Sequence, residues 1–164
     1  MRFLVLVVAM FAFGGWAGTA MGQSSGVTVL AGASSYDLSG VGNAWFSGAR
    51  FDARPIRFLV LEAGLHYFHY TAQSDDRVRH LIPEAQLQFE PVRGPFRPYL
   101  GAGAGAAWLI WRGDNSIELS LSAALGFRVD LRGSWGLLAE GRVRSIDPWV
   151  GSLGELGLGI SRRF

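Results

Sequence analysis

Three histidines, His66, His69 and His80, are the residues of this chain that could bind a metal ion. His66 and His69 have opposite parity, so their side chains would point to opposite faces of an extended segment. At most His66 and His80 can then share one face. We therefore expect no metal site.

Glycine occupies alternate positions in Gly101-x-Gly103-x-Gly105, a spacing that suggests a nucleotide-binding loop. Such a loop requires a strand, a turn and a helix in succession. Here the glycines alternate with apolar residues inside one extended segment, which indicates close packing within a strand. We expect no bound cofactor.

A serine–histidine hydrolase would need both side chains next to each other, with a carboxylate that orients the histidine. His69 is the only histidine whose parity matches the apolar side of a predicted strand, and no neighbouring segment supplies a convincing nucleophile. The sequence therefore predicts no catalytic residue and no enzymatic activity.

Charged side chains recur with one parity along several extended segments. Buried charges are costly unless they are paired, so charges on a common interior face should pair across strands. The sequence predicts that six residues form such a network: Glu62, Glu84, Arg128, Glu140, Arg142 and Glu155. This predicted network would stabilise the fold rather than conduct a solute.

The elements that position these residues follow from an apolar pattern of period two beyond Ser25. The pattern predicts eight strands, at residues 26–36, 43–53, 58–71, 79–90, 96–111, 116–131, 135–145 and 151–164. Strands of this length can cross a membrane when tilted. Tight turns are predicted at 54–57, 91–95 and 132–134, and outward loops at 37–42, 73–78, 112–115 and 146–150.

One face of the predicted strands is apolar, and the other combines charges with glycine and serine, which suit a narrow interior. The apolar face carries aromatic residues near both ends: Trp45, Tyr67 and Trp108 at one, Phe51, Phe89 and Phe164 at the other. These bands favour a membrane barrel over a soluble barrel whose apolar face points inward. Arg162 is expected to be the only charged strand residue on the apolar face, and Pro83 predicts a local bulge.

The amino terminus predicts secretion. Arg2 precedes an apolar run that ends at Phe13, and Ala20 and Gly22 fit the positions before a cleavage site. We predict a cleavable signal peptide at residues 1–22 and one barrel domain at 23–164. The chain contains no cysteine, which excludes disulfides and thiolate metal sites. Its formal net charge is +2, and no basic patch indicates nucleic-acid binding.

Four residues of the final strand, Leu156, Leu158, Ile160 and Phe164, share one side, and the chain ends on an aromatic residue. This ending resembles the assembly signal of bacterial outer-membrane β-barrels, although Arg162 takes a position that is usually apolar there. The segment 97–108 is similar to the fifth strand of the small outer-membrane β-barrel family. That family includes porin-like surface proteins and the transmembrane domain of outer-membrane protein A, and the resemblance extends over the whole mature chain.

The resemblance implies an all-β fold: an eight-stranded antiparallel up-and-down transmembrane β-barrel in the outer membrane of a Gram-negative bacterium. It also implies contact with outer-membrane lipids and lipopolysaccharide, and assembly by periplasmic chaperones and the barrel assembly machinery. We expect a monomer.

The expected function is a structural or surface-interaction role without a general pore. One alternative is a narrow channel or hydrophobic-ligand transporter, which a charged interior disfavours. Another is a lipid-modifying enzyme, because some eight-stranded outer-membrane barrels are lipid A deacylases or acyltransferases.

Overall fold

The computed structural model describes residues 25–36, 43–71, 77–111, 114–147 and 151–164. The predicted signal peptide lies outside these residues. The described chain forms eight strands: β1 (Ser25–Tyr36), β2 (Asn43–Ile56), β3 (Leu59–Thr71), β4 (Arg77–Phe89), β5 (Phe96–Trp111), β6 (Asp114–Asp130), β7 (Trp135–Ile146) and β8 (Gly151–Arg163). None of the described residues forms a helix long and apolar enough to cross a membrane.

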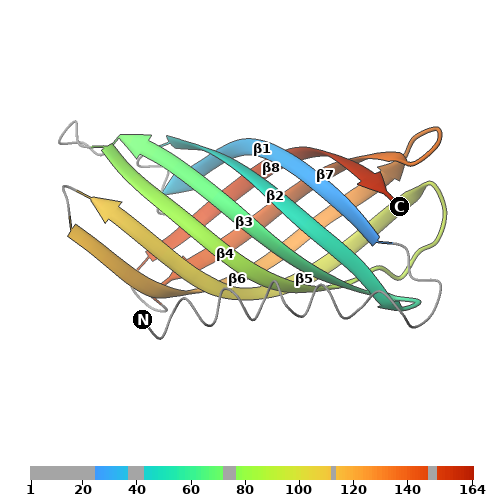
Figure 1. The fold of residues 1–164 in the computed structure, drawn as a ribbon, viewed down its shortest axis with the longest axis horizontal. Coiled ribbons are helices and arrows are strands. Elements are labelled where there is room, and N and C mark those ends of the chain that lie inside the picture. Colours follow the sequence, from blue (N-terminus) through green and yellow to red (C-terminus); the bar gives the residue numbers. More distant parts are fainter. Residues whose placement is uncertain (1–24, 37–42, 72–76, 112–113, 148–150) are drawn as a thin grey trace.

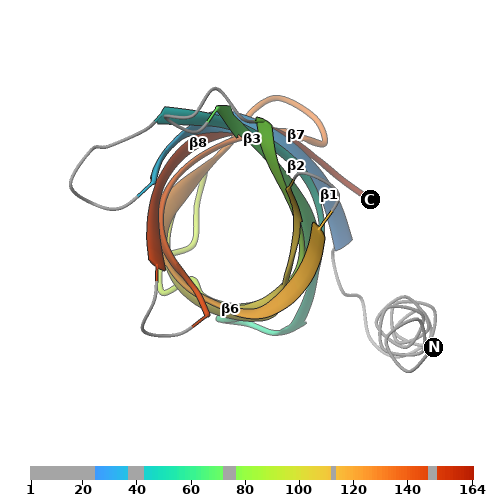
Figure 2. The same ribbon diagram turned by 90° about the vertical axis from the view of Figure 1, so that its left-hand side faces the viewer.

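Consecutive strands pair antiparallel and close into a barrel, as Figures 1 and 2 show. The first and last strands complete the ring, with pairs that run from Gly26 and Arg163 to Tyr36 and Leu153. The backbone N–H of Phe164 donates to the carbonyl oxygen of Ser25 at 3.0 Å. Closure leaves no unpaired sheet edge, which is what a membrane requires of strands. The predicted fold class is confirmed.

The barrel has two distinct ends. The turn end carries the connections β2–β3, β4–β5 and β6–β7 together with Phe164 (Figure 1). The opposite end, called the loop end here, is where β1, β3, β5 and β7 finish. The tight turn predicted at 54–57 is displaced. Pro55 and Ile56 belong to β2, where the register with β3 shifts between Ala53 and Ile56, and the turn is at residues 57–58. At the loop end, residues 77 and 78, predicted to be loop, begin β4.

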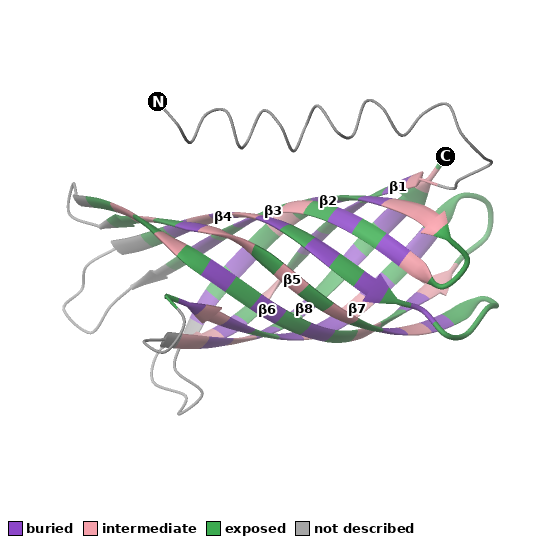
Figure 3. Cartoon of the chain, turned by 90° about the horizontal axis from the view of Figure 1, so that it is seen from below, coloured by how far each residue is buried: buried purple, intermediate pink, exposed green. Residues whose placement is uncertain are grey.

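Buried and exposed residues alternate along each strand (Figure 3). In β8, for example, Leu156 is 72% exposed while Glu155 is 3% exposed. The apolar set therefore faces outward and the charged set inward, which confirms the predicted faces. Arg162 is exposed as expected, but it is not alone, since Arg79 near the loop end of β4 is exposed as well. Arg79 has the parity of the outward-facing residues of β4, a match that the sequence interpretation missed.

Pro83 does not produce the predicted bulge. The pairs Leu81–Trp108 and Glu84–Gly105 keep one register on either side of it, with the ladder between β4 and β5 interrupted in between. Proline has no N–H to donate, so the two strands lose pairing without a change of register. Gly105 makes this geometry possible, because a Cβ atom there would collide with the Pro83 carbonyl.

Aromatic side chains surround both ends of the outer wall. Trp45, Tyr67 and Trp108 are exposed toward the loop end. The turn end carries a larger set: Phe51, Phe58, Phe89, Phe96, Phe127, Trp135 and Phe164. Aromatic rings at two levels, with Leu, Val and Ala between them, match the two interfaces of a bilayer and its hydrocarbon core.

Candidate functional site: an ion-pair network across the lumen

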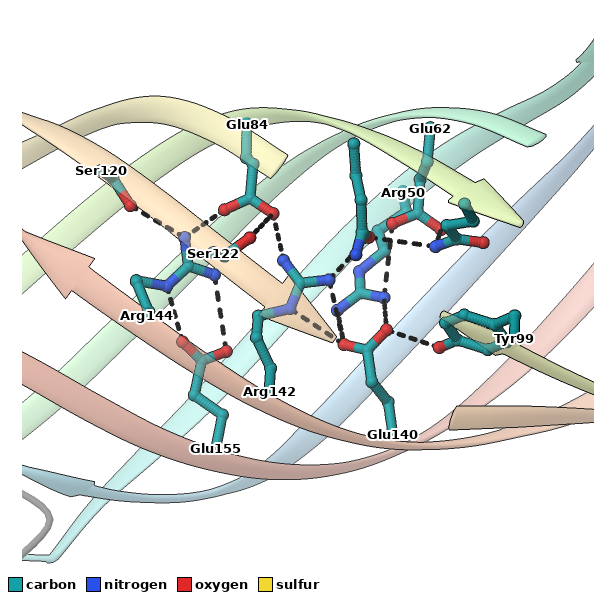
Figure 4. A network of polar contacts seen from close by, with 12 residues as sticks. Arg50, Glu62, Glu84, Tyr99, Ser120, Ser122, Glu140, Arg142, Arg144 and Glu155 are labelled. Atoms are coloured by element: carbon teal, nitrogen blue, oxygen red, sulfur yellow. Dashed lines mark hydrogen bonds and ion pairs between the residues drawn. The ribbon is translucent and has the colours of Figure 1, made fainter. Parts of the chain in front are cut away.

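The central part of the lumen holds four arginines and four glutamates, most of them labelled in Figure 4. They come from β2, β3, β4, β6, β7 and β8, each from an inward-facing position: Arg50, Glu62, Glu84, Arg128, Glu140, Arg142, Arg144 and Glu155. Positive and negative groups are equal in number, so this part of the interior carries no formal charge. Each of these residues is 6% exposed or less.

Arg144 is the most deeply buried charge. Its Nε donates to Glu155 Oε1 at 2.6 Å, and its Nη1 donates to Ser120 Oγ at 3.1 Å and to Glu84 Oε2. Its guanidinium also lies 5.6 Å from the ring centroid of Phe68. One side chain of β7 thus connects β8, β6 and β4.

Glu140 is the second hub. Arg50 donates to both of its carboxylate oxygens, at 2.9 and 2.7 Å, and the Tyr99 hydroxyl donates to Oε2 at 2.5 Å. Arg142 donates from Nε to Glu140 Oε1 at 3.1 Å and forms an ion pair with Glu84 through Nη1. Glu84 accepts from Arg142 and Arg144 at once, so it balances two guanidinium groups.

Several of these contacts span the lumen between strands that are not neighbours. Arg50 on β2 binds Glu140 on β7, although β1 and β8 separate these strands around the ring. Arg142 on β7 binds Glu84 on β4, which β5 and β6 separate from it. Side chains that meet in the middle of an eight-stranded barrel occupy the space that a channel would need.

Toward the turn end the network continues to the rim. Arg128 pairs with Glu62 at 3.2 Å and with Glu90, and its guanidinium lies 4.8 Å from the Tyr99 ring centroid. Glu90 lies just past the end of β4. Burial alone raises the pKa of its carboxyl, but Arg54, Arg128 and Arg97 hold that pKa below its usual value.

Where large side chains lie directly against the strand backbone inside the barrel, the wall has glycine. A Cβ atom at Gly126 would lie 2.6 Å from the Tyr99 hydroxyl and 2.7 Å from the Ala139 carbonyl oxygen. Only glycine therefore lets Tyr99 reach Glu140 from β5.

Gly101 and Gly103, which the sequence assigned to packing, similarly make room for side chains of β4. A Cβ atom at Gly101 would collide with Gln86 Nε2, and one at Gly103 would lie 2.8 Å from Glu84 Oε1.

The loop-end half of the lumen is apolar. Seven buried residues form one cluster there: Leu30, Phe46, Phe68, Ile82, Ala107, Ile146 and Leu153. Phe46 and Phe68 stack with ring centroids 5.4 Å apart. The predicted charged interior is thus observed in the turn-end half. In the loop-end half the inward parity is occupied mainly by aliphatic and aromatic side chains, together with the buried His66 and His80.

The structure brings all six residues of the predicted network inside, and each forms at least one ion pair. Arg50, Arg144, Glu90 and Tyr99 are further members that the prediction missed. Arg50 and Arg144 share the inward parity of the predicted members, so parity alone could have added them.

The histidines do not gather. His66 and His80 are buried inside the barrel, whereas His69 is exposed on the outer wall. Within the part of the chain that the structure describes, no three metal-binding side chains come together.

The outer wall offers one serine near His69. Ser47 on β2 pairs with Tyr67, two residues from His69 on β3, and both Ser47 and His69 are exposed. Sequence reasoning did not consider Ser47 as a neighbour, because register was needed to place it. No hydrogen bond joins these two described residues, and Trp45 and Arg79 are the cross-strand partners of His69. A nucleophile and base in working contact are therefore not observed there.

No protein-family model matches the chain, and no curated protein matches it. Solved structures do match. The neisserial surface protein A is 18% identical with a TM-score of 0.68, over 88% of this chain and 100% of that one. The attachment invasion locus protein of Yersinia pestis, in complex with the heparin analogue sucrose octasulfate, is 15% identical with a TM-score of 0.60, over 88% and 100%.

A third similar structure is that of the outer-membrane enzyme PagL, at 13% identity and a TM-score of 0.52, over 84% of this chain and 98% of that one. Likeness at such identities concerns the fold. The closed ring of eight antiparallel strands, apolar outside and charged within, is the fold of a small outer-membrane β-barrel. Because proteins with and without enzymatic activity share it, the fold does not assign a reaction.

Proposed function

We propose that this protein is a structural barrel of the bacterial outer membrane, which displays its loops at the surface and forms no general pore. The observation that supports this most strongly is the set of contacts that cross the lumen, including those from Arg50 to Glu140 and from Arg142 to Glu84. The apolar cluster closes the other half. A solute would have to separate buried ion pairs and displace packed side chains, and both are costly.

The absence of enzymatic activity is part of this proposal. A hydrolase of the outer wall needs a nucleophile, a base and an orienting carboxylate in mutual contact. His69 and Ser47 are neighbours without a hydrogen bond, and the carboxylates around them face the lumen in ion pairs. The geometry therefore supports a non-enzymatic barrel.

The last strand is proposed to carry the signal for the barrel assembly machinery. Leu156, Leu158 and Ile160 are 72%, 71% and 56% exposed on one side of β8, and Phe164 is 70% exposed at its end. Replacing Phe164 with Asp should lower outer-membrane levels strongly, whereas Phe164→Trp should assemble. Equal levels of both variants would reject the assembly role.

Fractionation of cell envelopes tests the membrane assignment. The protein should enter the outer-membrane fraction and migrate differently on gels before and after boiling, since folded barrels resist detergent. Protein in the soluble fraction with unchanged mobility would contradict it. Liposomes that contain the folded protein should not swell in small sugars, and rapid swelling would contradict the absence of a pore.

A further inference from the structure

The outer wall of the barrel is not uniformly convex. A shallow apolar groove of about 780 Å³ crosses the wall from Trp45 on β2 to Phe96 and Pro98 on β5. Where it passes over β7, small residues stand between taller neighbours. Its volume is within the range of about 300–1,000 Å³ that is typical of small-molecule sites. Over β7 the floor of the groove comes from Ala139 and Gly141, and its two sides come from Leu156 and Leu158 on β8 and from Leu125 and Phe127 on β6.

The register explains the groove. Ala139 pairs with Phe127 on one side and with Leu158 on the other, and Gly141 pairs with Leu125 and Leu156. Each small residue therefore lies between two large ones at the same height. A strip of small side chains flanked by two ridges suits an extended hydrocarbon chain, because the ridges contact it from both sides.

An unpaired cation lies at the same side of the barrel, nearer the turn end. Arg162 is exposed on β8, between Val27 and Trp135 on the neighbouring strands. Its guanidinium lies 5.6 Å from the Trp135 ring centroid and 6.0 Å from that of Phe164, and none of the described carboxylates pairs with it. Its neighbour Arg163, in contrast, binds Asp130 at 3.0 Å. Arg162 is thus held outward at the aromatic level of the turn end, without an acidic partner among the described residues.

The distance between Arg162 and the groove matches the distance between the headgroup of a phospholipid and the middle of its acyl chain. Leu158 is four residues from Arg162, which corresponds to about 13 Å of strand. Half of a hydrocarbon core is about 15 Å thick. An acyl chain that begins at the level of Arg162 therefore reaches the groove without leaving its own leaflet.

We propose that the wall formed by β6, β7 and β8 binds one anionic phospholipid of the periplasmic leaflet. Arg162 binds its phosphate, Trp135 contacts the glycerol region, and one acyl chain lies in the groove over Ala139 and Gly141. This inference rests on the proposed membrane location. The charge of the arginine selects an anionic headgroup, and the position of Arg162 at the turn end selects the leaflet on that side.

Competitive lipid capture tests this proposal. Folded protein in zwitterionic detergent is incubated with equal amounts of phosphatidylglycerol and phosphatidylethanolamine, purified again, and its bound lipids are quantified by mass spectrometry. Wild-type protein should retain phosphatidylglycerol with about fivefold preference, the effect of one basic side chain near anionic headgroups. Arg162→Gln should remove the preference but keep lipid, whereas Gly141→Leu, which fills the groove, should reduce retention of both lipids.

Two matched variants serve as controls. Arg132→Gln removes an exposed arginine of the β6–β7 turn, and Ala63→Leu enlarges an exposed residue of β3 away from the groove; both should behave as wild type. A preference that survives in Arg162→Gln, or that Arg132→Gln loses equally, would overturn the proposal.

Two further measurements keep the test decisive. Every variant is checked for heat-modifiable mobility, so that loss of the barrel is separated from loss of lipid. If Arg162→Gln does not fold, the wild-type preference should still fall as salt rises, since salt screens attraction between exposed charges. A salt-independent preference would contradict the role of Arg162 and leave the proposed function intact.

Discussion

The two halves of the lumen are held together by different interactions, ion pairs in one and apolar packing in the other. In the turn-end half, arginines and glutamates are buried in ion pairs whose partners lie on opposite walls, as for Arg142 and Glu84. In the loop-end half, Phe46 and Phe68 stack within an apolar cluster. Arg144 lies at the boundary, since it binds Glu84 and Glu155 and also faces the Phe68 ring.

The difference concerns what each half can tolerate. Contacts in an apolar cluster are non-directional, so an exchange between apolar side chains of similar volume costs little. A buried ion pair is directional, and removal of one partner leaves an uncompensated charge. We therefore expect mutations to have much larger effects in the turn-end half.

The largest effect is expected for Glu84→Leu. This change removes the carboxylate that Arg142 and Arg144 share, so the buried network keeps one positive charge in excess. Removing one partner of a buried ion pair costs about 3–5 kcal/mol. Urea unfolding in detergent, followed by the gel shift of the folded band, measures the loss. Glu118→Leu, on a partly exposed position of β6 that binds Ser116, serves as the control and should lose far less. Similar losses in the two variants would contradict a special role for the network.

The second prediction compares the lumen with the outer wall, which supplies no acceptors for arginine. Leu121, near the middle of β6, is 42% exposed, and Ile117, near its loop end, is 50% exposed. Leu121→Arg should cost about 2–4 kcal/mol and Ile117→Arg about 0–1 kcal/mol, because the cost depends on depth in the bilayer. Unfolding in lipid vesicles measures both. Equal costs would show that β6 does not cross the membrane as we describe.

A smaller effect is expected in the apolar half. Phe68→Leu keeps an apolar side chain of similar size and should cost about 1 kcal/mol. The same unfolding assay applies. A loss as large as that of Glu84→Leu would erase the distinction between the two halves.

The smallest effect is expected at the rim, and it depends on pH. The pKa of Glu90 is lower in the folded protein than its ordinary value. Its contribution is therefore present above that ordinary value of about 4.3 and is lost as pH falls through the folded pKa. The urea midpoint should decrease on acidification from neutral pH, and Glu90→Gln should reduce this decrease. An unchanged pH dependence in Glu90→Gln would show that Glu90 does not cause the loss of stability at low pH.

Much of the fold could be predicted because the period of a strand assigns each residue to one face. Parity placed Glu62 and Glu140 inside and Leu121 outside, as observed. Parity does not give register or the partner across the lumen. The contact of Arg50 with Glu140 joins strands that are not neighbours, and only the closed ring brings them together.

The apolar half of the lumen escaped prediction for another reason. Near the loop end both faces of the strands are apolar, so Phe46 faces the lumen while Trp45 faces outward. The pattern of polar and apolar residues then does not show which face points into the barrel. The shift of register at Pro55 was missed because the proline was assigned to a turn, whereas β2 continues through it.

Single-channel recording in planar bilayers tests the central claim most directly. If the ion pairs and the apolar cluster close the lumen, purified wild-type protein should give a flat baseline, with at most small and rare openings over a wide voltage range. Protein that is shown by its gel shift to be folded should be used. Stable, large and weakly selective channels from such protein would contradict the account and make this barrel a transport porin.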